Sequence, residues 1–214
     1  NASVDWFRIS VHGKSAHVST PHLGVDALYI ASQIVVAIQA LITRRTNPLE
    51  SILIGIGRLD AGTAYNVVAE EAAMEGTIRV FSPELRKATK ERIELVASSI
   101  AAMYGGTVSI EWKDFTSPLI NDEESTLEVR KVLTSVFGKD SVVESRTPSL
   151  GGDDFAEYIL KVPGCYAFVG SRNPEVPETG VAHHNSHFDV DDGALSVMVN
   201  LMSNYAIEFL NGEV

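Results

Sequence analysis

The order of two hydrophobic patterns constrains the fold of this chain most strongly. Residues 5–11 alternate apolar and polar side chains, as a half-buried β-strand does. Residues 25–42 repeat apolar side chains at helical spacing on two neighbouring stripes, so two surfaces must cover this helix. Strand patterns follow at 51–58 and 72–81. The first part of the chain therefore reads as strand, helix, strand, strand.

A second helix and a last strand complete this pattern. Ser82-Pro83 is a typical helix start, and a single apolar stripe carries the helix to about Tyr104. Gly105-Gly106 ends it, and residues 107–115 read as a strand. The order β-α-β-β-α-β is that of a ferredoxin-like sandwich, in which two helices cover one face of a four-stranded antiparallel sheet. We therefore expect residues 1–116 to form an α+β domain.

Residues 117–214 differ in charge and in pattern. They contain 6 basic and 16 acidic residues, against 11 and 12 in residues 1–116, and the net charge of the chain is -11. Such an acidic surface repels phosphate backbones, so we expect no nucleic acid partner. Helices near 124–137 and 193–210 with one short strand at 164–170 offer little core. This part is expected to be the end of an α/β domain.

The remaining composition points to a reducing compartment. Cys165 is the only cysteine, which excludes an internal disulfide framework. We find no apolar run as long as a membrane span and no signal peptide, so we expect a cytoplasmic protein without a membrane partner. The chain begins with Asn1 rather than Met. We therefore expect it to be part of a longer protein.

The connection Gly13-Lys14-Ser15-Ala16-His17-Val18-Ser19-Thr20-Pro21-His22-Leu23-Gly24-Val25-Asp26 is the first candidate for function. It places two histidines, two glycines and a proline between a strand and a helix, and loops held by rigid elements often carry function. Taken alone, it reads equally well as a polar turn that happens to contain histidine.

Histidines and acidic residues gather in a second candidate segment. They are His183, His184, His187, Asp189, Asp191 and Asp192. Imidazole and carboxylate are ligands of Zn and Mn. The spacing leaves a metal site and a solvated acidic loop both open, because three ligands cannot be assembled from this chain alone.

Four further residues are candidates for substrate binding. Gly151 and Gly152 could present backbone N–H groups to an anion, although an ordinary turn before a helix explains them as well. Asn66 lies between two expected strands. Arg79 lies on a strand, where an arginine is usually solvated. Arg79 gains interest if it meets Asn66 and His17 on one rim, since arginine binds carboxylates through two hydrogen bonds.

The chain resembles the dimetal aminoacylase-like hydrolases, which include aminoacylases, hippurate hydrolases and indoleacetyl-amino-acid hydrolases. The resemblance covers nearly the whole chain, and seven motifs occur in the order typical of the family. They are Gly13 to His17 with Pro21 to Asp26, Arg44 to Pro48, Gly62-Thr63-Ala64 through Asn66-Val67-Val68, Gly76-Thr77-Ile78-Arg79, Asn121-Asp122, Gly152-Asp153-Asp154-Phe155 and His184 to Asp189. Two departures are Asp153, where Glu is usual, and Asn185-Ser186, where Ser-Pro or His-Pro is more common.

The resemblance implies a lid domain that dimerises (1–116), followed by the C-terminal part of a metallohydrolase catalytic domain (117–214). The Cys-Gly-His-Asp segment and the Glu-Glu pair of the family lie upstream of the lid, and nothing in this sequence matches them. The implied cofactors are two divalent metal ions, Zn or Mn, in the whole protein. The chain alone is therefore expected to be inactive.

The resemblance also implies a role for each candidate residue. His184 would be a metal ligand, and His17 would reach a neighbouring active site and stabilise the oxyanion. Asn66 and Arg79 would orient the carboxylate and amide of a small N-acyl amino acid substrate. Gly151 and Gly152 would also contact the substrate.

Two other functions stay open, and one assembly is expected. The first is a dipeptidase or carboxypeptidase of the same clan, and the second is a freestanding ferredoxin-like module that binds a ligand or dimerises. The strand at 51–58 is an apolar edge without charge before Arg58, and open edges of this kind invite pairing. Together with the second apolar stripe of 25–42, it predicts a homodimer about a two-fold axis.

Overall fold

The structure is a computed structural model that describes residues 1–143 and 147–213, and these residues form two compact units. Unit 1 contains residues 1–120 and 148–157. Unit 2 contains the remaining described residues, 121–143, 147 and 158–213. The segment 148–157 thus belongs with the N-terminal part of the chain. The domain boundary expected between residues 116 and 117 stays a prediction.

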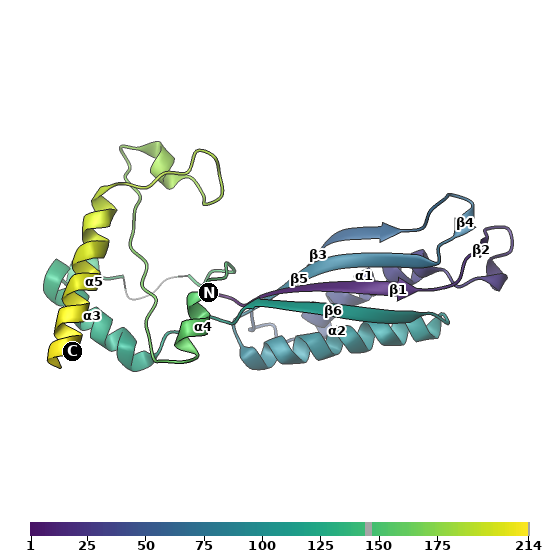
Figure 1. Ribbon diagram of the computed structural model, residues 1–214, viewed down its shortest axis with the longest axis horizontal. Helices are drawn as coiled ribbons and strands as arrows, with labels where there is room; N and C mark the ends of the chain where they lie inside the picture. Colours follow the sequence, from purple (N-terminus) through teal and green to yellow (C-terminus); the bar gives the residue numbers. More distant parts are fainter. Residues whose placement is uncertain (144–146, 214) are drawn as a thin grey trace. The chain divides into compact units, whose positions relative to one another are not determined.

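Unit 1 is built on one four-stranded antiparallel sheet in the order β3-β5-β1-β6 (Figure 1). Its strands are β1 (Val4–His12), β3 (Ile52–Ala61), β5 (Glu71–Val80) and β6 (Thr107–Thr116). A second, two-stranded sheet joins β2 (Ala16–His17) to β4 (Val67–Val68). The predicted ferredoxin-like order is confirmed, and β3 is an edge strand.

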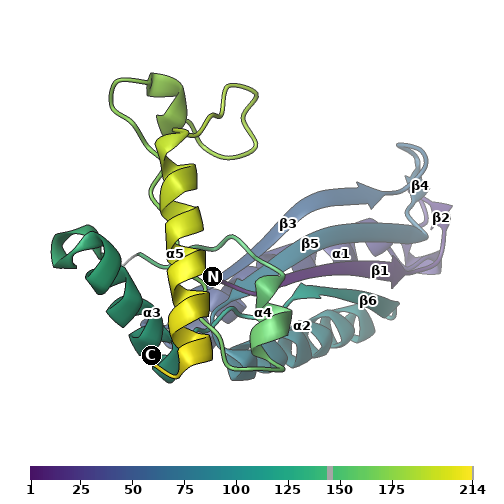
Figure 2. The same ribbon diagram turned by 60° about the vertical axis from the view of Figure 1, so that its left-hand side comes forward.

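Two helices cover one face of this sheet, as both views show (Figures 1 and 2). They are α1 (Ala27–Ala40), which continues into a π-helical turn at Leu41–Arg45, and α2 (Pro83–Met103). A short 3-10 turn, η1 (Pro21–Leu23), precedes α1. Fully buried side chains from both layers form the core, among them Phe7, Ile9, Ile34, Ile78 and Ile93. Each contributes roughly 1.5–3 kcal/mol through burial.

The ends of both helices have clear local causes. Asp26 Oδ1 accepts the backbone N–H groups of Leu28 and Tyr29, so α1 begins two residues later than expected. Ser82 Oγ accepts the N–H of Leu85 at 3.1 Å, which confirms the predicted cap of α2. At the other end of α2 the chain turns away through Gly105, whose φ of 82° suits glycine.

The helix of residues 27–45 is long and apolar enough to cross a membrane by length and composition. The expectation that no stretch reaches this length was therefore wrong on this criterion. Its Ile30, Ile34 and Ile38 side chains are fully buried against the sheet, however. That burial is characteristic of a core helix of a folded domain.

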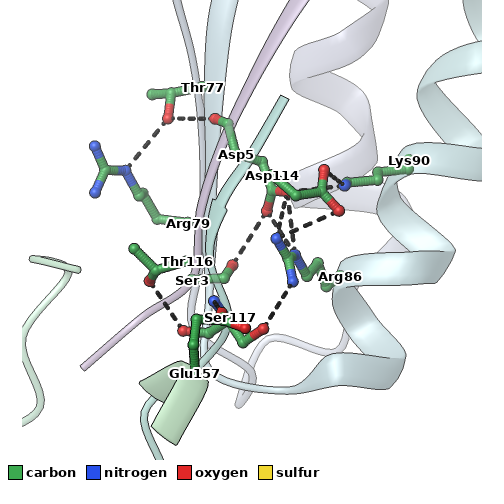
Figure 3. A network of polar contacts seen from close by, with 10 residues as sticks. All are labelled: Ser3, Asp5, Thr77, Arg79, Arg86, Lys90, Asp114, Thr116, Ser117 and Glu157. Atoms are coloured by element: carbon green, nitrogen blue, oxygen red, sulfur yellow. Dashed lines mark hydrogen bonds and ion pairs between the residues drawn. The ribbon is translucent and has the colours of Figure 1, made fainter. Parts of the chain in front are cut away.

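A polar network lies within unit 1 between the sheet and α2 (Figure 3). The buried carboxylate of Asp5 accepts hydrogen bonds from Arg86 and forms an ion pair with Lys90 at 2.8 Å. Lys90 also pairs with Asp114 on β6. Burial alone would raise the pKa of Asp114, but the hydrogen bond and charge of Lys90, with the charge of Arg86, lower it. The network therefore ties β1, α2 and β6 together.

Unit 2 is mainly helical in its described residues. Its elements are α3 (Glu123–Phe137), η3 (Lys139–Ser141), η4 (Pro177–Gly180) and α5 (Gly193–Asn211), and α4 (Phe155–Ile159) spans the boundary of the two units. Helices α3 and α5 pack on each other. Both helices were predicted.

The strand expected at 164–170 was wrong, because this segment has no regular structure. The described residues of unit 2 contain no other strand that could pair with it. Instead, the side-chain amide of Asn121 bonds both the N–H and the carbonyl of Tyr166, at 3.0 and 3.1 Å. A side chain thus supplies the pairing that a neighbouring strand would provide.

Candidate functional site

The loop of residues 13–26 is closed at its base by its own backbone. Lys14 and Val25 exchange N–H···O bonds of 2.9 and 2.8 Å. A Cβ atom on Gly13 would lie 2.1 Å from the carbonyl oxygen of Val25, and one on Gly24 would lie 2.8 Å from that of Lys14. Both glycines are therefore required by the close approach of the two strands of the loop. This closure holds the histidine within the loop in a defined place.

His17 lies in β2 on this loop, and its tautomer follows from its hydrogen bonds. The backbone N–H of Ser19 donates to His17 Nδ1 at 3.1 Å, and the Ser19 hydroxyl lies 2.6 Å from the same nitrogen. A backbone N–H can only donate, so Nδ1 is the acceptor and the neutral ring carries its proton on Nε2. The exposed His17 ring thus presents an N–H donor to its surroundings.

Asn66 lies beside the same loop, in the turn before β4. The backbone carbonyl oxygen of Asn66 accepts the N–H of Val18 at 3.1 Å, and Asn66 is exposed to solvent. The adjoining surface contains a cavity of about 560 Å³. The cavity is lined by both apolar and polar groups, among them Val18, Leu28 and Thr63. His17 and Asn66 therefore form one group, and a cavity of mixed polarity lies next to it.

Arg79 lies near the end of β5, on the face of the sheet that the helices leave uncovered (Figure 3). Its Nε donates to Thr77 Oγ1 at 3.2 Å, and its Nη1 donates to the carbonyl of Leu150 at 3.4 Å. The residue before Thr77 is a glycine because a Cβ on Gly76 would lie 2.3 Å from Phe7 Cζ. The motif of residues 76–79 therefore combines a packing glycine, a polar pair and a core Ile78.

Within one chain, Arg79 does not join His17 and Asn66. The loop with His17 lies where β5 begins, whereas Arg79 is eight residues beyond Glu71 in that strand. At about 3.3 Å per residue, the two groups are roughly 25 Å apart. Figure 1 shows β2 and β4 at the end of the sheet opposite the N-terminus. The single rim considered from the sequence is thus not formed within one copy.

Gly151 and Gly152 lie beside Arg79, but their geometry has local causes. Gly151 N–H already donates to Ser149 Oγ at 3.1 Å. A Cβ on Gly152 would lie 2.1 Å from Val4 Cγ2, so this glycine is needed for packing on β1. The N–H of Gly151 is therefore not free for an anion in this arrangement.

His184 has an unusual backbone. Its φ of 66° makes it the only non-glycine residue with positive φ in the described part of the chain. Histidine tolerates this left-handed region better than most residues, and such outliers concentrate at functional sites. The carboxylate of the nearby Asp191 is already engaged in two structural hydrogen bonds. It accepts one from the Asn173 side-chain amide at 2.6 Å and one from the Gly193 N–H at 2.8 Å.

The described residues do not compose a metal site by themselves. No group of three or more His, Cys, Asp or Glu side chains lies close enough to hold an ion in residues 1–143 and 147–213. A catalytic metal takes about three protein ligands. This donor set therefore does not fit a resident metal, and His184 could supply one ligand at most.

Two other residues that the sequence singled out have structural tasks. Asp122 Oδ1 accepts the N–H of Ser125 at 2.8 Å and caps α3, and this backbone hydrogen bond lowers the pKa of Asp122. Burial raises the pKa of the Cys165 thiol, although a hydrogen bond with Thr126 opposes it. A thiol with a raised pKa is a poor nucleophile at neutral pH.

The sequence patterns indicate no role for Ser19 or Thr77, although Ser19 lies in the connection of residues 13–26 and Thr77 in the motif of residues 76–79. Ser19 fixes the tautomer of His17, and Thr77 accepts a hydrogen bond from Arg79. Each lies two residues from the side chain that it contacts. That spacing, which places both side chains on one face of a strand, was the available signal for Thr77.

Comparison with known proteins places this geometry in a family. Residues 2–104 match the peptidase dimerisation domain. Thermostable carboxypeptidase 2 of Saccharolobus solfataricus is 36% identical over 211 residues, which are 98% of this chain and 52% of that protein. N-acetyl-L-cysteine deacetylase of Bacillus subtilis is 34% identical over 194 residues, which are 91% and 44% of the two chains.

A solved structure agrees in fold. A dinuclear metal-binding peptidase of the M20 family from Bacillus subtilis superposes with a TM-score of 0.74 at 29% identity, covering 98% of this chain and 51% of that one. The chain spans about half the length of these relatives. The chain therefore belongs to the M20 family of peptidases and carries its peptidase dimerisation domain.

Proposed function

We propose that the protein containing this chain is a metal-dependent amidohydrolase that cleaves the amide bond of N-acyl amino acids. The observation that carries the proposal is the rigid loop of residues 13–26, which presents the Nε2–H of His17 as a hydrogen-bond donor. The deacetylase among the relatives supports this substrate class. The chain would supply the substrate-facing lid and the end of the catalytic domain.

His17 would act on the charge that develops during hydrolysis. Attack on an amide carbonyl makes a tetrahedral intermediate with negative charge on oxygen. A donor held in place before the reaction stabilises that charge without reorganising. The Ser19 N–H fixes the proton of His17 on Nε2, as such a donor requires.

Arg79 and Asn66 would orient the substrate. An arginine can hold the free carboxylate of an amino acid through two parallel hydrogen bonds. The amide of Asn66 could donate and accept at the same time, as a substrate amide requires. Gly151 and Gly152 have no side chains, so they would contact the substrate only through backbone atoms other than the Gly151 N–H, which already donates to Ser149 Oγ.

The separation of these groups supports a site shared by two chains. An N-acyl amino acid is about as long as two residues, roughly 7 Å. His17 and Arg79 are roughly 25 Å apart in one copy, estimated from the rise along β5. One substrate molecule can contact both only if they come from different copies. The site would therefore be completed by dimerisation.

The dimer surface would consist of β3 and α1, within residues 51–58 and 25–42. β3 is an edge strand, and its first residues carry no charge before Arg58. On α1, Leu28 and Val36 are exposed, the latter by 70%. Pairing of two β3 edges about a two-fold axis would remove both features from water.

Most ligands of the metal ions in this proposal would not be among the described residues of this chain. His184 would be one ligand of a centre whose other ligands come from the rest of the protein. Two divalent ions would supply the activated water of the reaction, and Zn or Mn remains the sequence-based expectation. A cytoplasmic location also stays a prediction.

A carboxypeptidase or dipeptidase is the second candidate, since thermostable carboxypeptidase 2 is 36% identical to this chain. The freestanding module is the third. It is disfavoured because relatives match 91–98% of this chain, including unit 2. Substrates separate the first two candidates, since a peptidase prefers peptides over N-acetyl amino acids.

The experiment is a comparison of the whole protein with the 214-residue chain, each supplied with Zn or Mn. We expect the whole protein to release acetate from N-acetyl amino acids and the chain alone to show no turnover. Peptide cleavage without deacetylation would favour the second candidate. Turnover by the chain alone would show that its residues suffice, against the proposal.

A further inference from the structure

Thr77 stands between Arg79 and the buried start of β1 (Figure 3). Its hydroxyl donates to the carbonyl oxygen of Asp5 at 2.7 Å. The hydroxyl oxygen of Thr77, Oγ1, in turn accepts the Nε–H of Arg79 at 3.2 Å. Because the backbone carbonyl can only accept, the direction of both hydrogen bonds is fixed. Thr77 therefore links the guanidinium of Arg79 to the backbone of the neighbouring strand.

The far end of this link is held firmly. Asp5 is fully buried, and its carboxylate accepts two close hydrogen bonds from Arg86, at 2.8 and 2.9 Å. Lys90 adds an ion pair of 2.8 Å. Asp5 is also paired on both sides within the sheet, with Ile78 and with Asp114. The carbonyl that Thr77 contacts is therefore among the best-fixed acceptors of unit 1.

The link decides which edge of Arg79 is available. A guanidinium can offer a carboxylate either its side edge, Nε with Nη2, or its end edge, Nη1 with Nη2. Thr77 occupies Nε, and Nη1 makes only the 3.4 Å contact with Leu150. Among the residues that the structure describes, Nη2 has no protein partner. The end edge is therefore the one left for a ligand.

We propose that Thr77 is a positioning residue that holds Arg79 ready to bind a substrate carboxylate end-on. The inference rests on the proposed substrate-binding role of Arg79. It adds a residue to which neither the family match nor the relatives assign a task. Thr77 itself touches no substrate, and it acts through the orientation of Arg79.

A simpler explanation is that Thr77 suits a β-strand and fills the surface beside Trp6 and Gly55. Thr77→Val separates the two explanations, because valine keeps the shape and the strand preference but loses the hydroxyl. Thr77→Ser keeps the hydroxyl and loses the methyl group. Thr107→Val on β6 is the matched control, since the Thr107 side chain makes no hydrogen bond within the described residues.

The first measurement is the solvent exchange of the Arg79 Nε proton, by NMR of the arginine-labelled 214-residue chain. We expect Thr77→Val to accelerate this exchange about tenfold, because a hydrogen bond to a charged group is lost. Thr77→Ser and Thr107→Val should match the wild type, and equal thermal unfolding would exclude a folding defect. Unchanged exchange in Thr77→Val would overturn the proposal.

The second measurement uses the whole protein and compares N-acetyl amino acids with their C-terminal amides. Thr77→Val should raise KM for the carboxylate substrates about tenfold, leave kcat nearly unchanged and spare the amides. Thr77→Ser should restore KM. If the NMR exchange changes but KM does not, Arg79 is held by Thr77 without serving the carboxylate, which overturns the functional half of the proposal. Loss of all turnover in the wild type would instead count against the proposed function.

Discussion

Asp5 and Arg86 form a two-pronged ion pair inside unit 1, with Arg86 Nε 2.9 Å and Nη2 2.8 Å from the carboxylate of Asp5. Asp5 is fully buried, and the Arg86 side chain is 14% exposed. Burial works to lower the pKa of Arg86, but the hydrogen bonds and the charge of Asp5 raise it above its ordinary value. This pair fastens α2 to the start of β1, where the chain enters the sheet.

Arg86→Met should destabilise unit 1 by about 3 kcal/mol, because it leaves a buried carboxylate with one cation fewer. Both tryptophans of the chain, Trp6 and Trp112, lie in unit 1, so their fluorescence during denaturant unfolding reports on this unit. Lys87→Met, at an exposed position of the same helix, is the control and should change stability little. Equal effects of the two substitutions would contradict the structural role of the ion pair.

Gly13→Ala should destabilise the loop that carries His17. The added Cβ would lie 2.1 Å from the carbonyl oxygen of Val25, and this backbone atom cannot move without breaking the Lys14–Val25 pairing. We expect a loss of about 2 kcal/mol in the free energy of unfolding. Ser15→Ala changes an exposed position of the same loop and serves as the comparison. A Gly13→Ala protein as stable as the wild type would show that the loop base is open in solution.

The Tyr205 hydroxyl should lose its proton only at very high pH. Burial, followed by its hydrogen bond to Glu128 at 2.9 Å, raises the pKa of Tyr205 to about 12. A raised folded pKa adds stability that is complete below the unfolded value near pH 10 and is lost as the pH rises through about 12. The phenolate absorbance step near pH 12 should disappear in Tyr205→Phe. Its persistence in that variant would assign the step to another tyrosine.

The dimer surface can be tested on α1 and β3 together. Val36 is 70% exposed on α1, and Leu53 is 38% exposed on the edge strand, so a lysine at either position is harmless in a single copy. In a dimer, each lysine charge would be buried without a partner, which is costly. Val36→Lys and Leu53→Lys should sediment as monomers, whereas the wild type should sediment as a dimer at micromolar concentration. Leu95→Lys on α2 is the control, and a monomeric wild type would refute the interface.

The fold of unit 1 was largely predictable from the sequence because its signals are local. Alternation in β1, helical spacing in α1 and the Ser82 cap each depend on neighbouring residues. The strand expected at 164–170 failed for the opposite reason. A strand needs a partner, and no periodicity in the segment itself says whether one lies beside it.

The candidate site was predictable in its residue types but not in its arrangement. His17 and Arg79 stand in recognisable motifs, yet their separation depends on the length and register of β5. No local pattern indicates that Gly152 is required by Val4, a residue 148 positions earlier. The role of Thr77 likewise depends on Asp5, which the sheet register brings opposite Ile78. Such pairings are tertiary and have no local signature.

The most direct test of this account is the kinetics of His17→Ala in the whole protein, with the metal content of each preparation measured. The removal of one oxyanion donor typically lowers kcat about 10²–10³-fold. We predict a loss of this size with unchanged metal content, because His17 is a donor held by Ser19. Loss of metal in His17→Ala, or a kcat equal to that of the wild type, would contradict the role assigned to His17.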